Sequence, residues 1–271
     1  MRRALLVALG WLCLTGAAAS FPNTYDTDAS TYFLQLSING CATPTASFKA
    51  AINIYIIAEK AALNWGNQDF QGVFATTDSC TAGTNLAQPG LYNITWSGPP
   101  TFAVQTGLNG NGSTILGDLG VNQSALTRTT QNSAHVDVWT NSANVRRAAG
   151  LAGTAAGLEV DPQTNKVTIL NSSSGNGITD TGGGTAGLHF ADRNSSGAIT
   201  TGLNGAVQTS AGSSTSAALN ANHVVVCEIS ATTCANGINE LFFGIGGPMN
   251  SESLHYTNVR NLLLALGVTG I

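Results

Sequence analysis

The sequence has little charge. Lysine and arginine together number 10, and aspartate and glutamate 14, among 271 residues, for a formal net charge of −4. A chain without a broad basic surface does not complement a phosphate backbone, so nucleic acid is not an expected partner. The 43% of hydrophobic residues is more than a disordered chain usually has. Glycine is abundant instead, with 32 residues, which fits many short strands joined by tight turns.

Long hydrophobic runs are equally scarce. One apolar stretch, Ala4 to Thr15, follows the basic start Met1-Arg2-Arg3 and precedes the small residues Gly16 to Ser20. It is shorter than the roughly 20 residues of a membrane helix, and its flanks match an export signal cleaved near Ala19. We therefore predict a signal peptide over residues 1–19 and a secreted or periplasmic mature chain without a membrane span. An uncleaved N-terminal anchor is the alternative.

Cysteine is sparse, with five residues, of which Cys13 lies in the predicted signal peptide. The other four are an even number, as is typical of disulfides in an oxidising compartment. Cys227 and Cys234 flank the tip of a predicted hairpin, so we expect them to pair, which leaves Cys41 to pair with Cys80. Three connectivities are open to four cysteines. Their spacing does not match paired zinc knuckles, so no metal site is predicted.

Short strand patterns dominate from Tyr92 onward. The segment Gly187 to Ala211 contains Asn204-Gly205, a strong hairpin signal because a type I′ turn needs positive φ at both central positions. Ser133 to Thr140 alternates cleanly between apolar and polar residues, as one strand of a half-buried sheet does. Strands at about ten-residue spacing predict an all-β fold with antiparallel sheets in a sandwich or barrel.

Two segments favour helix. The first is Thr43 to Lys60, in which apolar residues recur every four positions, with a strand over Ile52 to Ile57 as the alternative. The second is C-terminal, where Asn250 or Ser251 can cap an amphipathic helix that Gly267 ends. An amphipathic helix buries its apolar side, and the sandwich is the surface available for it.

The order of several features resembles a known family. These features are Leu63-Asn64-Trp65, Tyr92-Asn93-Ile94-Thr95, the run from Gly107 to Ser113, the run from Gln131 to Trp139, the turn from Arg193 to Ser196, Leu203-Asn204-Gly205 and the closing helix. From about Asp26 onward they resemble the concanavalin A-like, lectin/laminin-G-type jelly rolls of bacteriophage tail and other virion structural proteins and of related bacterial surface proteins. The resemblance implies a two-sheet jelly roll that binds carbohydrate or another surface ligand, with no family catalytic residues. The export signal and four mature cysteines depart from a virion role.

The expected fold is therefore all-β, a two-sheet antiparallel jelly-roll sandwich with an N-terminal helical segment and a C-terminal amphipathic helix. We predict a signal peptide over 1–19, an N-terminal segment with one helix over 20–90, and a concanavalin A-like jelly-roll domain with the C-terminal helix over 91–271. Within the second part, Ser20 to Ala42 is expected to be irregular.

One strand face carries the favoured ligand-binding residues. His135, Asp137 and Trp139 alternate along a strand, so their side chains share one face of the sheet. Sugars are typically held by an aromatic ring against their apolar face, with planar polar groups taking the hydroxyls. We therefore predict a saccharide site here. The alternative is that Trp139 covers part of the sheet while the other two lie in water.

Glu159 and Asp161 are weaker candidates, for catalysis. Glycosidases of this superfamily often place their carboxyl groups as Glu-x-Asp-x-x-Glu on one strand, and a glycosidase needs two such groups. Here Thr164 stands at the third position, so the motif is incomplete.

Calcium supports sugar binding in many lectins of this fold, through oxygen ligands. Asp118, Asp180 and Asp192 lie near predicted turns but form no compact Asp-x-Asn-x-Asp cluster. No metal or cofactor is predicted, and Ca²⁺ is the one ion considered. The preferred function is an exported, non-catalytic protein that binds a glycan or another surface ligand, or a structural module of a surface or virion assembly. The alternative is a secreted glycoside hydrolase acting on a polysaccharide.

Overall fold

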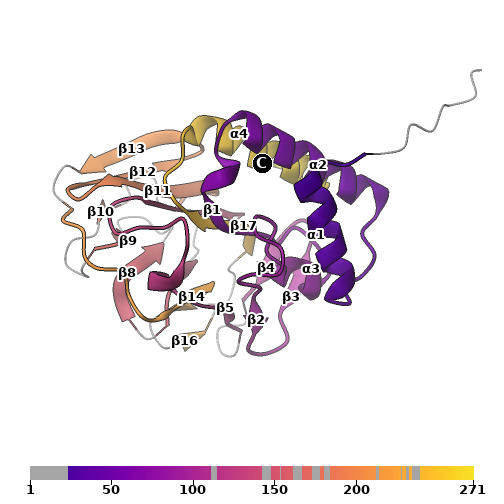
Figure 1. Ribbon diagram of the computed structural model, residues 1–271, viewed down its shortest axis with the longest axis horizontal. Helices are drawn as coiled ribbons and strands as arrows, with labels where there is room; N and C mark the ends of the chain where they lie inside the picture. Colours follow the sequence, from indigo (N-terminus) through magenta and orange to yellow (C-terminus); the bar gives the residue numbers. More distant parts are fainter. Residues whose placement is uncertain are drawn as a thin grey trace, which may run out of the picture.

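The strands form two large antiparallel sheets (Figure 1). The computed structural model describes residues 24–110, 115–141, 148–152, 154–160, 167–172, 178–179, 184–211, 214–226, 228–229, 232–233 and 239–271. The first sheet contains, in spatial order, β13 (Ala206–Ala211), β12 (Ala198–Leu203), β11 (Gly187–Ser195), β6 (Ala134–Thr140), β17 (Asn239–Gly246), β4 (Gly107–Asn109) and β3 (Thr101–Ala103), and β1 (Gln68–Val73) also pairs with β17.

The second sheet has seven strands. In spatial order they are β10 (Ile178–Thr179), β9 (Val167–Leu170), β8 (Thr154–Val160), β7 (Ala149–Leu151), β14 (His223–Val226), β5 (Gly117–Asn122) and β2 (Thr95–Trp96). A separate pair joins β15 (Glu228–Ile229) to β16 (Thr232–Thr233). The predicted two-sheet antiparallel sandwich is confirmed.

A single apolar core lies between the sheets. Val136 and Val138 of β6 and Phe243 and Ile245 of β17 supply the first sheet's share, and Val224 of β14 belongs to the second sheet's share. Burying one such side chain contributes roughly 1.5–3 kcal/mol, so this core is the main source of stability.

The predicted turn between β12 and β13 is confirmed. Asn204 and Gly205 have φ values of 54° and 75°, which are the positive values that a type I′ turn requires. The predicted turn from Arg193 to Ser196 falls at the end of β11, where the chain reverses into β12 and residues 194–196 are exposed, but the side chain of Arg193 itself is fully buried. Its guanidinium donates hydrogen bonds to the carbonyls of Leu170 and Ser214. These bonds join β11 of the first sheet to β9 of the second sheet and to the segment that contains Ser214.

Four α-helices occur in the described part of the chain: α1 (Thr27–Ile38), α2 (Ala46–Ala61), α3 (Ser79–Gly83) and α4 (Glu252–Ala265). Ser20 to Ala42 was expected to be irregular and the N-terminal segment to hold one helix, and α1 and α3 correct both expectations. Asp26 caps α1 by accepting a hydrogen bond from Asp28 N at 2.9 Å, and the buried Tyr32 and Leu36 anchor it. The predicted helices correspond to α2, which excludes the strand alternative, and to α4, whose N-cap is Ser251 as expected.

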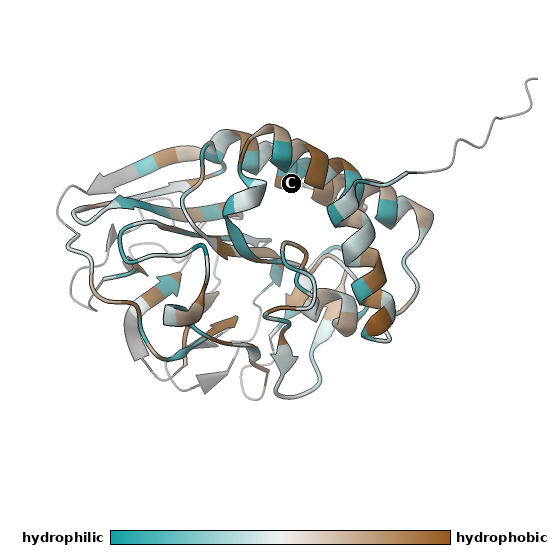
Figure 2. Ribbon diagram, in the orientation of Figure 1, coloured by the Kyte–Doolittle hydropathy of each residue, from teal (hydrophilic) through white to brown (hydrophobic). Residues whose placement is uncertain are grey.

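Helices α1, α2 and α4 form a layer over the outer face of the first sheet, whereas Ala82 of α3 belongs to the core between the sheets. Helices α2 and α4 lie side by side along that outer face, and the covering layer joins Tyr55 of α2 and Val259 of α4 to Trp139 and Phe242 of the sheet (Figure 1). Some hydrophobic residues remain outside, including Leu34 and Ile38 of α1, and Figure 2 shows hydrophobic segments along that helix. Short 3₁₀ turns lie at Trp65–Asn67 and Gln123–Ala125. Within the described residues, no helix combines the length and apolar character needed to cross a membrane.

Candidate functional site

The predicted face of β6 lies beneath α4. His135, Asp137 and Trp139 do share one face, but each is at least 98% buried, so the prediction of an accessible saccharide site is wrong. Trp139 stacks on Tyr256 of α4, with ring centroids 5.6 Å apart and planes 7° from parallel. The alternation along the strand correctly indicated a shared face, and the amphipathic helix is what covers it.

A buried ion cluster links three elements under the same helix. His255 of α4 donates from Nδ1 to Glu59 Oε2 of α2 at 2.9 Å and from Nε2 to Asp137 Oδ2 of β6. Asn258 Nδ2 donates to the other oxygen of Glu59 at 2.7 Å. All three ionisable side chains are buried. The cluster therefore joins α2 and α4 to the sheet, and its lack of access gives it a structural role.

Electrostatics in the cluster favour a charged imidazole. Desolvation opposes the charge on His255, but the carboxylates of Glu59 and Asp137 outweigh it and raise the pKa of His255 well above its usual value. His135 shows the contrasting case, because burial lowers its pKa and its neutral ring donates from Nδ1 to the carbonyl of Gly247. Glu59 and His255 were not among the residues predicted from the sequence. Helical periodicity places Glu59 on the same face of α2 as Ile52 and Tyr55, and His255 on the same face of α4 as Val259. A charged residue on a buried helix face is the signal that could have indicated them.

Two further carboxyl groups lie at this interface. Desolvation raises the pKa of Asp192 to about 7. Desolvation also raises the pKa of Glu252 well above its usual value, and neighbouring carboxylates, including Asp192, add to the effect while His255 opposes it.

Glu240 of β17 is fully buried, and neither carboxyl oxygen has a hydrogen-bond partner in the part of the chain that the structure describes. Desolvation raises its pKa well above the ordinary 4.5. Because the folded state keeps a proton that the unfolded chain releases, stability is greatest below pH 4.5 and falls as the pH rises toward the folded pKa. The substitution Glu240→Gln should therefore raise the free energy of unfolding at pH 8 by roughly 1–3 kcal/mol. Urea unfolding at pH 8 and pH 4 checks this, and an equal effect at both pH values would contradict it.

Of the two catalytic candidates, the structure describes Glu159 but not Asp161. Glu159 lies in β8, is 93% buried and is paired in register with Gly150 and Ile169. Asp161 lies outside the described residues, as do the predicted signal peptide, Asp180 and the cysteines Cys227 and Cys234. Of the residues considered for calcium, Asp118 instead accepts a hydrogen bond from His223 Nδ1 at 2.9 Å.

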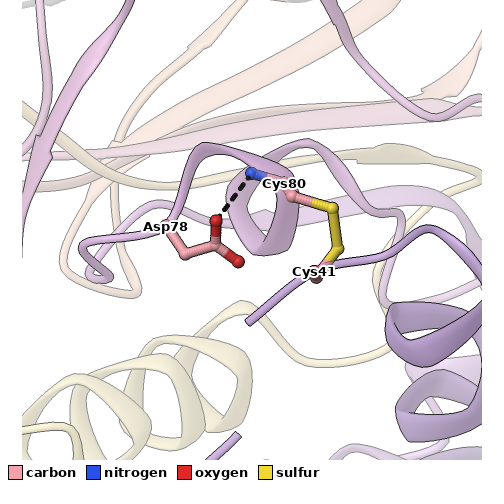
Figure 3. A group of neighbouring side chains, drawn as sticks. All are labelled: Cys41, Asp78 and Cys80. Atoms are coloured by element: carbon pink, nitrogen blue, oxygen red, sulfur yellow. Dashed lines mark hydrogen bonds between the residues drawn. A yellow bond between two sulfur atoms is a disulfide. The ribbon is translucent and has the colours of Figure 1, made fainter. Parts of the chain in front are cut away.

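The predicted disulfide between Cys41 and Cys80 is confirmed, with the two Cα atoms 5.2 Å apart. Asp78 lies beside it and caps α3, as Figure 3 shows. Its carboxylate accepts hydrogen bonds from Cys80 N at 3.3 Å, Thr81 N at 3.1 Å and Ala42 N at 3.2 Å. Partial burial opposes the charge, but a hydrogen bond from Thr81 Oγ1 at 2.6 Å, together with these backbone bonds, outweighs it and lowers the pKa of Asp78. Ligand atoms of the three residues lie within 4.8 Å of one another, yet the two sulfurs are bonded together and are not thiolate ligands.

Asp78 also lines an open groove, which we call the Asp78 groove. Its volume is about 240 Å³. Its walls come from the start of α2, the segment after β1, the turn after β3 and the end of α4; the lining residues are Ala42, Thr43, Pro44, Thr45, Ser47, Phe48, Ala75, Thr76, Thr77, Asp78, Thr81, Val104, Ala265 and Leu266. Six hydroxyl groups, one carboxylate and one aromatic ring therefore meet in one depression. No local pattern in the sequence indicates this groove, because its walls are up to 224 positions apart in the chain.

Comparison with protein-family models and with curated protein sequences finds no match. Among solved structures, the chain is similar to domain 4 of AbnA, a GH43 extracellular arabinanase from Geobacillus stearothermophilus, in complex with arabinotriose. The two are 15% identical with a TM-score of 0.45, over 70% of this chain and 97% of that one.

The chain is also similar to binding domains of botulinum neurotoxins. The receptor binding domain of the C/D mosaic serotype is 15% identical with a TM-score of 0.43, over 73% of this chain and 51% of that one. Botulinum neurotoxin type C, whose cell entry depends on interaction with two ganglioside molecules, is 11% identical with a TM-score of 0.44, over 78% and 54%. The chain spans about half the length of these neurotoxin chains.

Proposed function

We propose that this chain is an exported, non-catalytic saccharide-binding protein whose ligand lies in the Asp78 groove. The observation that carries the proposal is the composition of that groove, in which hydroxyl groups and a carboxylate surround an apolar wall. The disulfide between Cys41 and Cys80 supports export, because such bonds persist in oxidising compartments.

The chemistry of the groove suits a sugar. Thr43, Thr45, Ser47 and Thr77 are exposed, and each hydroxyl both donates and accepts hydrogen bonds, as sugar hydroxyls do. The lowered pKa of Asp78 keeps its carboxylate ionised at neutral pH, so that it accepts hydrogen bonds from a ligand. Aromatic and aliphatic surface then packs against the apolar face of the sugar ring.

The size of the groove limits what it holds. Its volume of about 240 Å³ is below the roughly 300–1,000 Å³ of sites for drug-sized ligands. A single sugar ring at the end of a glycan is therefore the expected occupant.

Binding is favoured over hydrolysis by the number of carboxyl groups. Asp78 is the one carboxyl group among the described residues that line the groove. Hydrolysis of a glycoside needs two, at about 5 Å or roughly 6.5–9.5 Å. The alternative of a glycoside hydrolase therefore finds no support at this site.

A glycan array on the mature chain tests the proposal. The substitution Ser47→Trp places a bulky side chain on an exposed lining residue and should lower saccharide affinity at least about tenfold, which is 1.4 kcal/mol. Ala50→Trp is the matched control, because Ala50 is exposed one turn further along α2 and does not line the groove.

Two results would overturn the proposal. One is a folded protein that binds no saccharide, which would leave the structural-module interpretation. The other is undiminished binding by Ser47→Trp, which would place the ligand elsewhere.

A further inference from the structure

A second hollow lies on the opposite side of α3 from the Asp78 groove, and we call it the Trp96 hollow. Its volume is about 320 Å³. Residues 79, 80, 83 and 84 line it, whereas residues 78 and 81 line the groove. Within α3 itself, Thr81 faces the groove, whereas Ser79, Cys80 and Gly83, which at 100° per residue lie roughly 100–160° away from it, face the hollow. The remaining walls include Asn39, Asn93 and Trp96.

The indole of Trp96 is a half-buried platform with a set orientation. Its ring lies over Gly117, where an added Cβ would come within 2.7 Å of it. Phe102 meets it edge-on, with centroids 5.4 Å apart, and Nε1 donates to the carbonyl of Ser79 at 3.3 Å. A ring held in this way suits stacking against the apolar face of a sugar, since little conformational entropy remains to be lost.

Amide groups stand beside this ring. Asn93 Oδ1 accepts a hydrogen bond from Asn85 N at 3.0 Å, which orients the side chain. Within the described residues, its Nδ2 donates no hydrogen bond and so offers donors to a ligand. The amide of Asn39 is oriented by Gln35 and Thr84. Planar amides beside an indole are the groups with which proteins commonly hold sugars.

The disulfide joins two chain segments that each pass from one depression to the other. In the first segment, Asn39 lines the hollow and Ala42 lines the groove, and Cys41 lies between them in the chain. In the second segment, Cys80 lines the hollow and Asp78 lines the groove. The bond between Cys41 and Cys80, visible in Figure 3, keeps these segments together. Because a helix is about 10 Å across, a ligand longer than one sugar ring is needed to reach both depressions.

We infer that the Trp96 hollow is a second saccharide subsite, and that the ligand is an oligosaccharide that crosses the disulfide between Cys41 and Cys80. This inference rests on the proposed function of the groove. The inference specifies the ligand as a glycan chain of several units. It also gives the disulfide a role, because the bond sets the spacing of the two depressions.

An array of immobilised neutral mono- to hexasaccharides tests the inference. The wild-type chain should bind tetra- to hexasaccharides at least about tenfold more tightly than mono- and disaccharides. Asn93→Asp keeps the acceptor for Asn85 N and removes the two donors, and Ser79→Trp fills the hollow from an exposed position. Both variants should reduce the affinity for long glycans to the level of short ones and leave the affinity for short ones unchanged.

The control is Asn220→Asp. Asn220 Oδ1 also accepts a backbone hydrogen bond, from Asn222 N at 2.9 Å, and this residue lines neither depression. The two proposals fail in different ways. Affinity that is independent of glycan length, or long-glycan binding that survives in both hollow variants, would overturn the second subsite while leaving the groove in place. Absence of all saccharide binding, or binding that Ser47→Trp does not weaken, would overturn the proposed function itself.

Discussion

Replacement of His255 with alanine is expected to lower the free energy of unfolding by about 3–5 kcal/mol at pH 7. The substitution removes the one imidazolium between Glu59 and Asp137 and leaves two carboxyl groups without their shared partner at fully buried positions. Breaking a buried ion pair from one side is costly because the remaining charge keeps its desolvation penalty. Urea unfolding monitored by circular dichroism measures the change.

The pH dependence of the loss separates a charge effect from a packing effect. Without His255, the cost lies in the uncompensated charge of the two buried carboxyl groups, and acid removes that charge. The deficit of the variant should therefore shrink between pH 7 and pH 4. Asn261→Ala is the control, since Asn261 is exposed on α4 and its loss should change stability by no more than about 0.5 kcal/mol. A deficit below 1 kcal/mol, or one equal at both pH values, would show that the cluster contributes little charge stabilisation.

The double substitution Cys41→Ser and Cys80→Ser is expected to lower the free energy of unfolding by about 4 kcal/mol. The two cysteines are 39 positions apart, and the chain-entropy model assigns this cost to a loop of that length when the crosslink is removed. The crosslinked loop contains α2 and β1, so the loss should affect both the covering layer and one strand of the first sheet.

Single substitutions sharpen this test. Because either one breaks the bond, Cys41→Ser and Cys80→Ser should each cost nearly as much as the double variant, so that their effects are strongly non-additive. Guanidinium unfolding without reductant measures all three variants against the wild type. A double variant as stable as the wild type would mean that the bond contributes nothing to the fold.

Much of the fold was predictable because its signals are local. The alternation of Ser133 to Thr140 predicted β6, and Asn204-Gly205 predicted a turn whose φ values the structure confirms. Helix α1 was missed because Ser30 and Thr31 are weak helix formers. Its cap at Asp26 and the burial of Tyr32 compensate, and burial is a tertiary effect that no local window contains.

The sequence by itself determined the strand and helix patterns and the antiparallel all-β class, since each depends on residues that are neighbours in the chain or on composition. Tertiary structure alone decided accessibility. Alternation places His135, Asp137 and Trp139 on one face of a strand, but it does not say that α4 will cover that face. The pairing of Glu59 with His255 joins residues 196 positions apart, and the groove at Asp78 is assembled from equally remote segments. Contacts of that range depend on how the chain returns across the sheet. For this reason the strand pattern indicated a face that is buried in the folded protein, whereas the accessible groove is formed by segments that are distant in the sequence.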